Sequence, residues 1–298
     1  MSTDRWFQPI PDEEYKRWQV QLLQFSSGEV SQHMRSCLPA PPENGFSTNL
    51  ETVHFSCTAR ALNIYSAILL LLQHDFWEEA TALSRSLYEM LLNLHEIHRN
   101  LSDPKDTEEQ ARKYVRFGAL QRYLGARTDL VHGVHPDDDV TVDEGLVQPF
   151  DDQIEQQFAE FRAPKPKAPW HRTWKQDWCD KNIRELAEDS GDYRHAESYH
   201  AFFFRSSSLL HSTPYSVLSV GAAFPLLSEP DEAKRKEETT KDRQRGWLNA
   251  WFCATFYLID IVEWTKDVLV GFNPHWLDAQ RRAIDRIRTE YHPPFPSL

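Results

Sequence analysis

Residues 76–97 read FWEEATALSRSLYEMLLNLHEI, and this stretch decides the fold. Its apolar side chains recur in alternating steps of four and three residues, which places them along one side of an α-helix. Such a regular seam indicates a closely packed antiparallel neighbour. Because the His74-Asp75 junction is short, the expected neighbour is a helix over residues 49–73, with Asn49 as its N-cap. The seam consists of Phe76, Ala80, Leu83, Leu87, Met90, Leu94 and Ile97.

Helix signals continue on both sides of this pair. Pro11 is followed by three acids, which favours a helix start, and the sequence PAPPEN at 39–44 breaks that helix. Asp103-Pro104 opens a charged helix that we expect to end near residue 130, before an acidic, loop-like stretch over 133–148. Further helices are expected over 178–190, 193–210 and 246–270, and a short one after Pro274. Residues 229–245 carry twelve charges in seventeen positions, typical of a solvated helix face or a mobile connection.

These patterns predict an all-α protein: an up-and-down bundle of long antiparallel helices with an acidic loop excursion in the middle. The ten glycines are too few for a turn-rich β protein of 298 residues. We expect three regions: an N-terminal helix with a Pro-rich linker over 1–46, a helical core over 47–228, and a charged connection with C-terminal helices over 229–298 that pack on the core.

Charge and cysteine content narrow the function classes. The net charge of -12 argues against non-specific DNA binding, although a local basic cleft is compatible with it. No signal peptide is visible, and the apolar runs at 67–72 and 250–262 are too short to span a bilayer. The four cysteines are dispersed without a CxxC pair, as expected of reduced thiols. We expect a cytoplasmic protein that contacts no membrane and uses no cofactor.

The candidate chemistry lies between residues 193 and 211, where Tyr193, Tyr199, Arg205 and His211 recur every six residues. Six residues correspond to about 9 Å along a helix and about 120° around it, so Arg205 and His211 cooperate only across a helix end near Pro214 or across a homodimer. A neutral His can take the proton of a ribose 2′-hydroxyl while an Arg stabilises the phosphorane, which is metal-independent RNA cleavage. The alternative is that Arg205 pairs with an acid across the bundle and His211 caps helix carbonyls.

Two neighbouring patterns are weaker. Ser207 and Ser208 share the helix face of His211, but the sequence places no third, orienting acid for a Ser nucleophile. Arg127 and His132 form a second Arg-x4-His spacing, where the charged helix enters the acidic stretch. The acids and histidines of residues 132–139 match no metal-site spacing and are typical of a solvated loop.

Arg85 and Glu89 stand one helical turn apart, off the apolar seam of residues 76–97. One interpretation is a surface pair that contributes a few tenths of a kcal/mol. The other is a polar pair that faces the helix of residues 193–211, where Arg85 would be a second cation near His211.

These residues carry a resemblance. The stretch 78–97 is followed later in the chain by a pattern that begins at Trp178 and ends at His211. Together they resemble a bacterial all-helical family, the domain of unknown function 5677, over roughly residues 50–220. The family brings no activity with it. More distantly, the helical layout and the Arg205-x5-His211 spacing are similar to the HEPN superfamily, whose members include ribonucleases with an Arg-x4–6-His motif. Those ribonucleases usually have Asn, Asp or His directly after the Arg of the motif, and this chain has Ser206 there. The family resemblance rests on Arg85, Glu89, Trp178, Lys181, Tyr193, Tyr199, Ser207 and His211.

Two hypotheses follow. In the first, the protein is HEPN-like and acts on RNA bound in a local basic cleft, with His211 as general base, Arg205 as phosphate clamp and Arg85 assisting. In the second, it is a non-enzymatic module that binds a partner or ligand, and Arg85, Glu89, Tyr199 and His211 form a buried hydrogen-bond network that holds helices in register.

Overall fold

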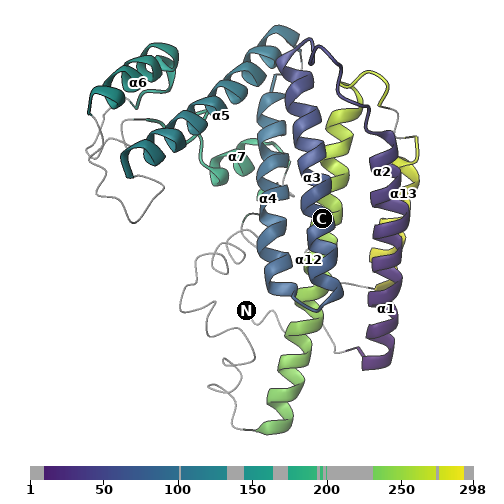
Figure 1. The fold of residues 1–298 in the computed structure, drawn as a ribbon. Helices are drawn as coiled ribbons and strands as arrows, with labels where there is room; N and C mark the ends of the chain where they lie inside the picture. The colour runs from purple at the N-terminus through teal and green to yellow at the C-terminus, as the bar shows by residue number, and fades with distance from the viewer. Residues whose placement is uncertain are drawn as a thin grey trace.

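The computed structural model describes residues 10–100, 102–132, 144–163, 174–192, 195–196, 199, 231–272 and 275–291. This part of the chain is helical, as predicted, and the only β-type pairing within it is an isolated bridge between Arg162 and Trp174. Three long helices form the centre, α1, η2, α2 and α13 lie on one side of them, and α5 and α6 lie on the other (Figure 1). The central helices are α3 (Asn49–Gln73), α4 (Trp77–Ile97) and α12 (Glu232–Lys266).

The outer elements are short or charged. On the first side, α1 (Asp12–Gln24) continues through the π-helix η2 (Phe25–Ser31) into α2 (Gln32–Cys37), beside α13 (Leu277–Tyr291). The other side carries α5 (Pro104–His132), α6 (Glu144–Gln157), the 3-10 turn η3 (Ala159–Phe161) and α7 (Ile183–Asp189).

The antiparallel pair of α3 and α4 confirms the bundle class, with two local corrections. Thr48, not Asn49, is the N-cap of α3, because its side chain and that of Glu51 form a reciprocal capping box. Leu87 and Leu94 are fully buried, but Phe76 is 54% exposed. Phe76 precedes the first residue of α4 and is not part of the helix. The buried four-three seam therefore begins at Ala80, one step later than predicted.

α4 packs against α12 as well as against α3, so its buried apolar surface extends beyond the predicted seam. The surface also includes Tyr88, Leu91 and Leu92, which are buried. α12 runs antiparallel to α3, since the indole of Trp247 donates to the Leu72 carbonyl at one end and His54 meets Thr265 at the other. α12 is therefore parallel to α4, which a long intervening chain permits.

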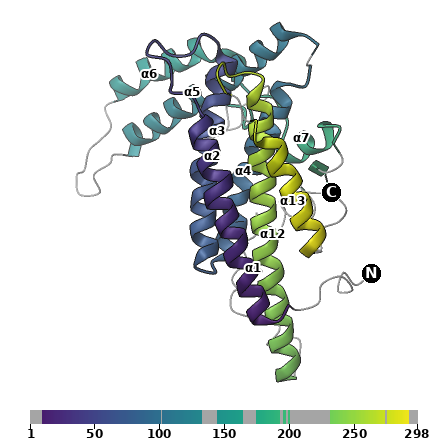
Figure 2. The same ribbon diagram turned by 90° about the vertical axis from the view of Figure 1, so that its right-hand side faces the viewer.

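The charged segment before residue 246 is helical. Asp231 caps α12 by accepting from the backbone of Ala233 and Lys234, and the helix then continues without a break to Lys266. Figure 2 shows its first turns projecting beyond the bundle. Of the two interpretations of this segment, the solvated helix face is confirmed.

Two expected boundaries were wrong. The acidic stretch 133–148 ends earlier, because α6 begins at Glu144. α7 begins at Ile183, not at residue 178, because Asn182 and Glu185 form a capping box that starts the helix there. Of the helix expected over 193–210, only residues 195, 196 and 199 lie within the described chain.

One described helix, α3, is long and apolar enough to cross a membrane by length and composition, and half of its apolar window is buried. The apolar run at 67–72 lies inside α3 and is by itself too short to span a bilayer, but the whole helix is longer. α3 packs on α4 and α12, so its composition also suits a core helix. The cytoplasmic location and the three-region division of the chain stay predictions.

Candidate functional site

Four polar residues of α4 form a continuous stripe on one face of the helix. Arg85, Glu89, Asn93 and Glu96 are spaced by four, four and three residues, which aligns them along the axis. The guanidinium Nε of Arg85 donates to Glu89 Oε1 at 2.7 Å, and the side-chain amide of Asn93 donates to the Glu89 carbonyl at 2.8 Å. The side chains of Arg85 and Glu89 are 20% and 34% exposed. We call these four residues the α4 polar stripe.

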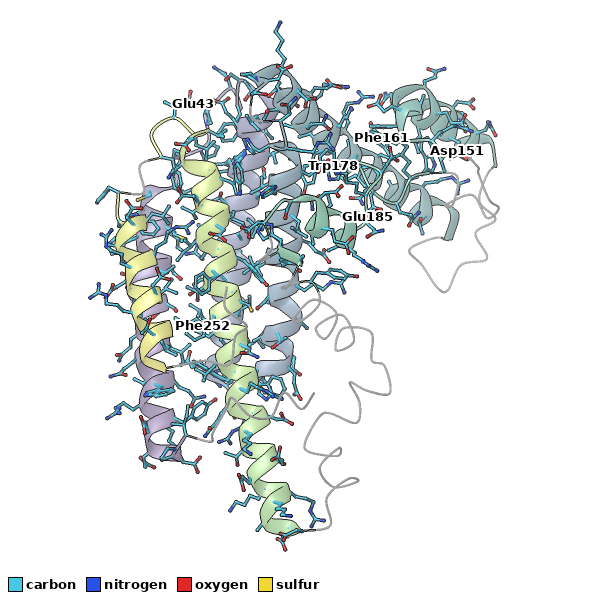
Figure 3. All side chains as sticks on the ribbon, turned by 180° about the vertical axis from the view of Figure 1, so that it is seen from behind. Glu43, Asp151, Phe161, Trp178, Glu185 and Phe252 are labelled. Carbon is cyan, nitrogen blue, oxygen red and sulfur yellow. The ribbon has the colours of Figure 1, made fainter. Side chains whose placement is uncertain are left out.

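The segment 174–192 lies against this stripe and contributes two side chains to it. The indole Nε1 of Trp178 donates to Asn93 Oδ1 at 2.7 Å, and the Trp178 ring meets Tyr114 of α5 edge-on at 5.5 Å. Figure 3 labels Trp178 where the segment meets the bundle and Glu185 on α7. Trp178 is buried. Its hydrogen bond therefore joins α4 to the segment 174–192 where water has little access.

The second link is an ion-pair network centred on Glu96, whose side chain is only 7% exposed. Lys181 Nζ lies 3.0 Å from Glu96 Oε2 and 2.9 Å from Asp189 Oδ2, and Arg99 lies 2.9 Å from the other Glu96 oxygen. Desolvation disfavours the charged lysine, but the hydrogen bonds to Asp189 and Glu96 outweigh it and raise the pKa of Lys181. The carboxylate is thus buried with two cations, which satisfies its charge.

A pair of buried histidines lies at the end of the bundle where α3, α4 and α12 meet. His54 Nε2 and His98 Nε2 are 2.7 Å apart, and His54 Nδ1 is 3.2 Å from Thr265 Oγ1. Thr265 donates its own hydroxyl proton to the Ile261 carbonyl, so it accepts from His54 Nδ1–H and from the Thr58 hydroxyl. His54 Nε2 is then the acceptor of an N–H from His98. The network thereby assigns both neutral tautomers.

Burial makes these histidines weak bases. Desolvation, and then the neighbouring His98, lowers the pKa of His54 to about 3, while desolvation and His95 lower that of His98 to about 4. The His98 ring also stacks on Trp264 at 4.9 Å. A general base near neutral pH needs a pKa near 7. The pair is therefore suited to joining helices and poorly suited to proton transfer.

The predicted site residues divide into two groups. Arg85, Glu89, Trp178 and Lys181 lie on or against the α4 polar stripe, and half-buried Tyr199 is close enough to Tyr88 of α4 to raise the pKa of that tyrosine, after desolvation. The others lie outside the described residues, so their arrangement stays a prediction: Tyr193, Arg205, Ser207, Ser208 and His211.

The second Arg-His spacing has a structural explanation on its Arg side. Arg127 of α5 forms two parallel hydrogen bonds with Asp151 of α6, at 2.6 and 2.9 Å, and both side chains are less than one-fifth exposed. Such a bidentate pair joins the two helices. In the part of the chain that the structure describes, no group of three or more His, Cys, Asp or Glu side chains could hold a metal ion.

Sequence reasoning missed Asn93, Glu96 and the pair of His54 and His98. The spacing of the α4 polar stripe was a usable signal, because the four residues follow the same periodicity as the apolar seam. The histidines gave no such signal, since 44 residues separate them and their contact depends on the packing of three helices.

The fold and the stripe define the class as an all-α bundle with a polar seam between α4 and the segment that follows α6. The family model described as "Family of unknown function (DUF5677)" matches residues 51–221, which is more than half of the chain. The chain therefore belongs to this family. No curated protein and no solved structure matches it.

Proposed function

We propose that this protein is a non-enzymatic binding module, in which the α4 polar stripe is a structural network and ligand binding takes place elsewhere on the bundle. One observation carries the proposal: Glu89, Asn93 and Glu96 of the stripe each hold a hydrogen-bonded partner within the protein. Asn93 and Glu96 hold Trp178 and Lys181 of the segment 174–192 on α4, and Glu89 holds Arg85 of the same helix. These polar groups are thus occupied by partners inside the protein.

Burial decides how strongly the network acts. Glu96 is 7% exposed, so removing a cationic partner leaves a poorly solvated carboxylate with less compensation. The exposed pair of Arg184 and Glu188 on α7, at 2.7 Å with side chains 59% and 42% exposed, has the same chemistry in water. Exposed pairs typically contribute only about 0.2–1 kcal/mol.

A double-mutant cycle tests the structural role. We expect Glu96→Gln and Lys181→Met to show a coupling energy of about 1–3 kcal/mol in urea unfolding, because the two groups share one buried contact. The matched control, Arg184→Met, should cost less than about 0.5 kcal/mol. A coupling energy near zero between Glu96 and Lys181 would show that the stripe does not hold the segment 174–192 on α4. That result would contradict the proposed structural role of the stripe.

The competing function is HEPN-like RNA cleavage by His211 and Arg205. Its test is an RNA digestion assay on structured and single-stranded RNAs, with purified wild type, His211→Ala and Arg205→Ala, with and without EDTA. The proposed module leaves all RNAs intact. EDTA-resistant cleavage that yields 2′,3′-cyclic phosphate ends, and that both variants lose, would replace the proposal with the enzymatic function. RNA is the partner in the enzymatic alternative only. Homodimerisation and a cytoplasmic location are proposed with either function.

A further inference from the structure

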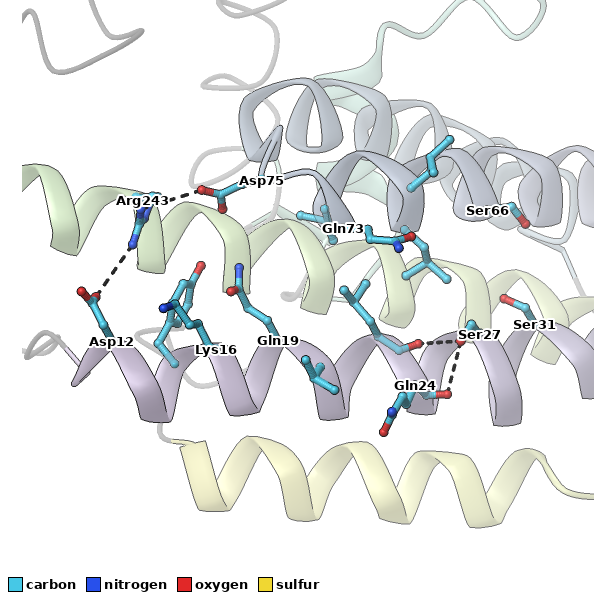
Figure 4. A pocket seen from close by; sticks show the side chains of 16 residues that line it. Asp12, Lys16, Gln19, Gln24, Ser27, Ser31, Ser66, Gln73, Asp75 and Arg243 are labelled. Atoms are coloured by element: carbon cyan, nitrogen blue, oxygen red, sulfur yellow. Dashed lines mark hydrogen bonds and ion pairs between the residues drawn. The ribbon is translucent and has the colours of Figure 1, made fainter.

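A groove with a volume of about 990 Å³ runs between α1 and the second half of α3, and no residue of the α4 polar stripe lines it (Figure 4). Its size is that of a pocket for a drug-sized organic molecule. Leu23, Leu69 and Leu72 give it an apolar lining, and Arg243 of α12 and Asp75 stand at one end. Only the α3 side of the groove, Ser66–Asp75, belongs to the residues that the family model matches.

Two buried hydroxyl groups that line this groove lack hydrogen-bond partners among the described residues. Tyr15 is 2% exposed and Ser31 is 8% exposed, yet neither Tyr15 Oη nor Ser31 Oγ is bonded. A buried hydroxyl without a partner is costly, and native proteins rarely leave one so. Sixteen residues of helix separate them, roughly 24 Å along the axis. The groove thus offers an unused polar group towards each end.

The end near Tyr15 carries an excess of negative charge. Arg243 lies 3.9 Å from both Asp12 and Asp75, which is longer than the 2.6–3.0 Å contacts of Arg127 with Asp151 and of Lys181 with Glu96 and Asp189. Arg243 is therefore the shared and only loosely paired cation of both carboxylates. Lys16, the other cation of the lining, reaches Glu13 and has a side chain 67% exposed. Asp12, Asp75 and Arg243 together carry two negative charges and one positive charge. One negative charge at this end of the groove is therefore not balanced by a close cation.

The backbone at Asp75 indicates that this carboxylate is placed there at a cost. α3 ends in a Schellman motif, in which Phe76 N–H bonds to the Leu71 carbonyl and Asp75 N–H to the Leu72 carbonyl. The motif puts Asp75 at φ 63°, where Gly is the usual residue. Desolvation also raises the pKa of Asp75, although Arg243 and a hydrogen bond from Gln19 oppose the shift. A nearby cation would relieve that desolvation.

We propose that the groove binds an organic cation, a protonated amine that carries an apolar chain. The ammonium group lies beside Arg243, where it pairs with the carboxylates of Asp12 and Asp75 that Arg243 reaches only at 3.9 Å, and it donates to Tyr15 Oη. The chain lies along Leu23, Leu69 and Leu72, and its far end reaches towards Ser31. The π-helix η2 carries Ser31, and π-helical turns are found frequently at functional sites.

This inference deepens the proposed function, because it rests on the protein being a binding module and gives that module a ligand class. The two can fail separately. RNA cleavage would overturn the non-enzymatic proposal without affecting amine binding, and absence of amine binding would leave the coupling between Glu96 and Lys181 untouched.

The experiment is a calorimetric titration of the full chain with n-octylamine, and with 1-octanol and octanoate as uncharged and anionic counterparts of equal chain length. We expect saturable binding of one n-octylamine per chain and at least roughly fivefold weaker binding of the other two, since only the amine pairs with the carboxylates. Equal binding of 1-octanol, or n-octylamine uptake without saturation, would overturn the assignment.

Two isosteric variants locate the site. Asp75→Asn removes the charge but tolerates the left-handed backbone, and we expect it to weaken n-octylamine binding roughly fivefold or more. Tyr15→Phe should weaken binding roughly 2- to 10-fold while leaving the unfolding midpoint in urea unchanged or higher, because the hydroxyl has no partner to lose. The control is Asp285→Asn on the exposed side of α13, which should bind as wild type does. Undiminished binding in Asp75→Asn and Tyr15→Phe, or loss of stability in Tyr15→Phe, would overturn the proposal.

Discussion

Acidification from pH 7.5 to 5.0 should destabilise this protein through the buried pair of His54 and His98. His54 has an ordinary pKa of 6.5 in the unfolded chain and a pKa of about 3 in the folded protein. Between these values the unfolded chain binds a proton that the folded protein does not. Stability is therefore complete above pH 6.5 and declines as the pH falls towards 3.

The magnitude follows from the two pKa values. At pH 5.0 the shift from 6.5 to about 3 costs about 2 kcal/mol, and at pH 7.5 it costs almost nothing. His98 adds a contribution of the same sign, since its pKa is lowered to about 4. Burial is the main reason for the lowered pKa of His54, and the geometry adds to it, because a proton on His54 Nε2 would oppose the N–H of His98 across 2.7 Å.

The assay is urea unfolding followed by tryptophan fluorescence at pH 7.5 and 5.0, for wild type and His54→Gln. The variant cannot titrate at this position, so its loss of stability on acidification should be about 2 kcal/mol smaller than that of wild type. His74→Gln, at the exposed end of α3, should behave as wild type does. If His54→Gln and wild type lost the same free energy, the buried-histidine argument would be refuted.

Two further predictions concern the packing of the core, and urea unfolding checks both. A Cβ at Gly246 would lie 2.2 Å from the Trp77 ring, so Gly246→Ala should lower the free energy of unfolding by about 1–3 kcal/mol. The control Gly118→Ala, in open space on α5, should raise it by about 0.5–1 kcal/mol. Equal effects of the two substitutions would contradict the close packing of Gly246 on Trp77. Leu87→Ala should cost about 2–5 kcal/mol, because Leu87 is fully buried on α4, which packs on both α3 and α12, and a loss below 1 kcal/mol would contradict its central position.

Local signals explain which helices could be predicted. The bounds of α3 and the partnership of α3 with α4 followed from dense apolar periodicity and a short junction, which is three residues long in the structure. The charged half of α12 remained open between helix and connection, because solvated residues carry no periodic apolar signal. Its helical state depends on a cap at Asp231 and on the packed half that follows. α7 was expected too early because Trp178 fits a helical pattern, although its indole instead bonds to Asn93.

By itself, the sequence determined the all-α class, the antiparallel pair α3 and α4, and the family, because each rests on patterns within short stretches of chain. Only the tertiary structure decided what the polar residues do. Trp178 and Lys181 reach partners 85 residues away, and His54 and Thr265 meet across 211 residues. Such contacts depend on how whole helices pack, which local spacing does not encode. The groove beside Tyr15 likewise depends on tertiary structure, because α1, α3 and Arg243 of α12 all line it.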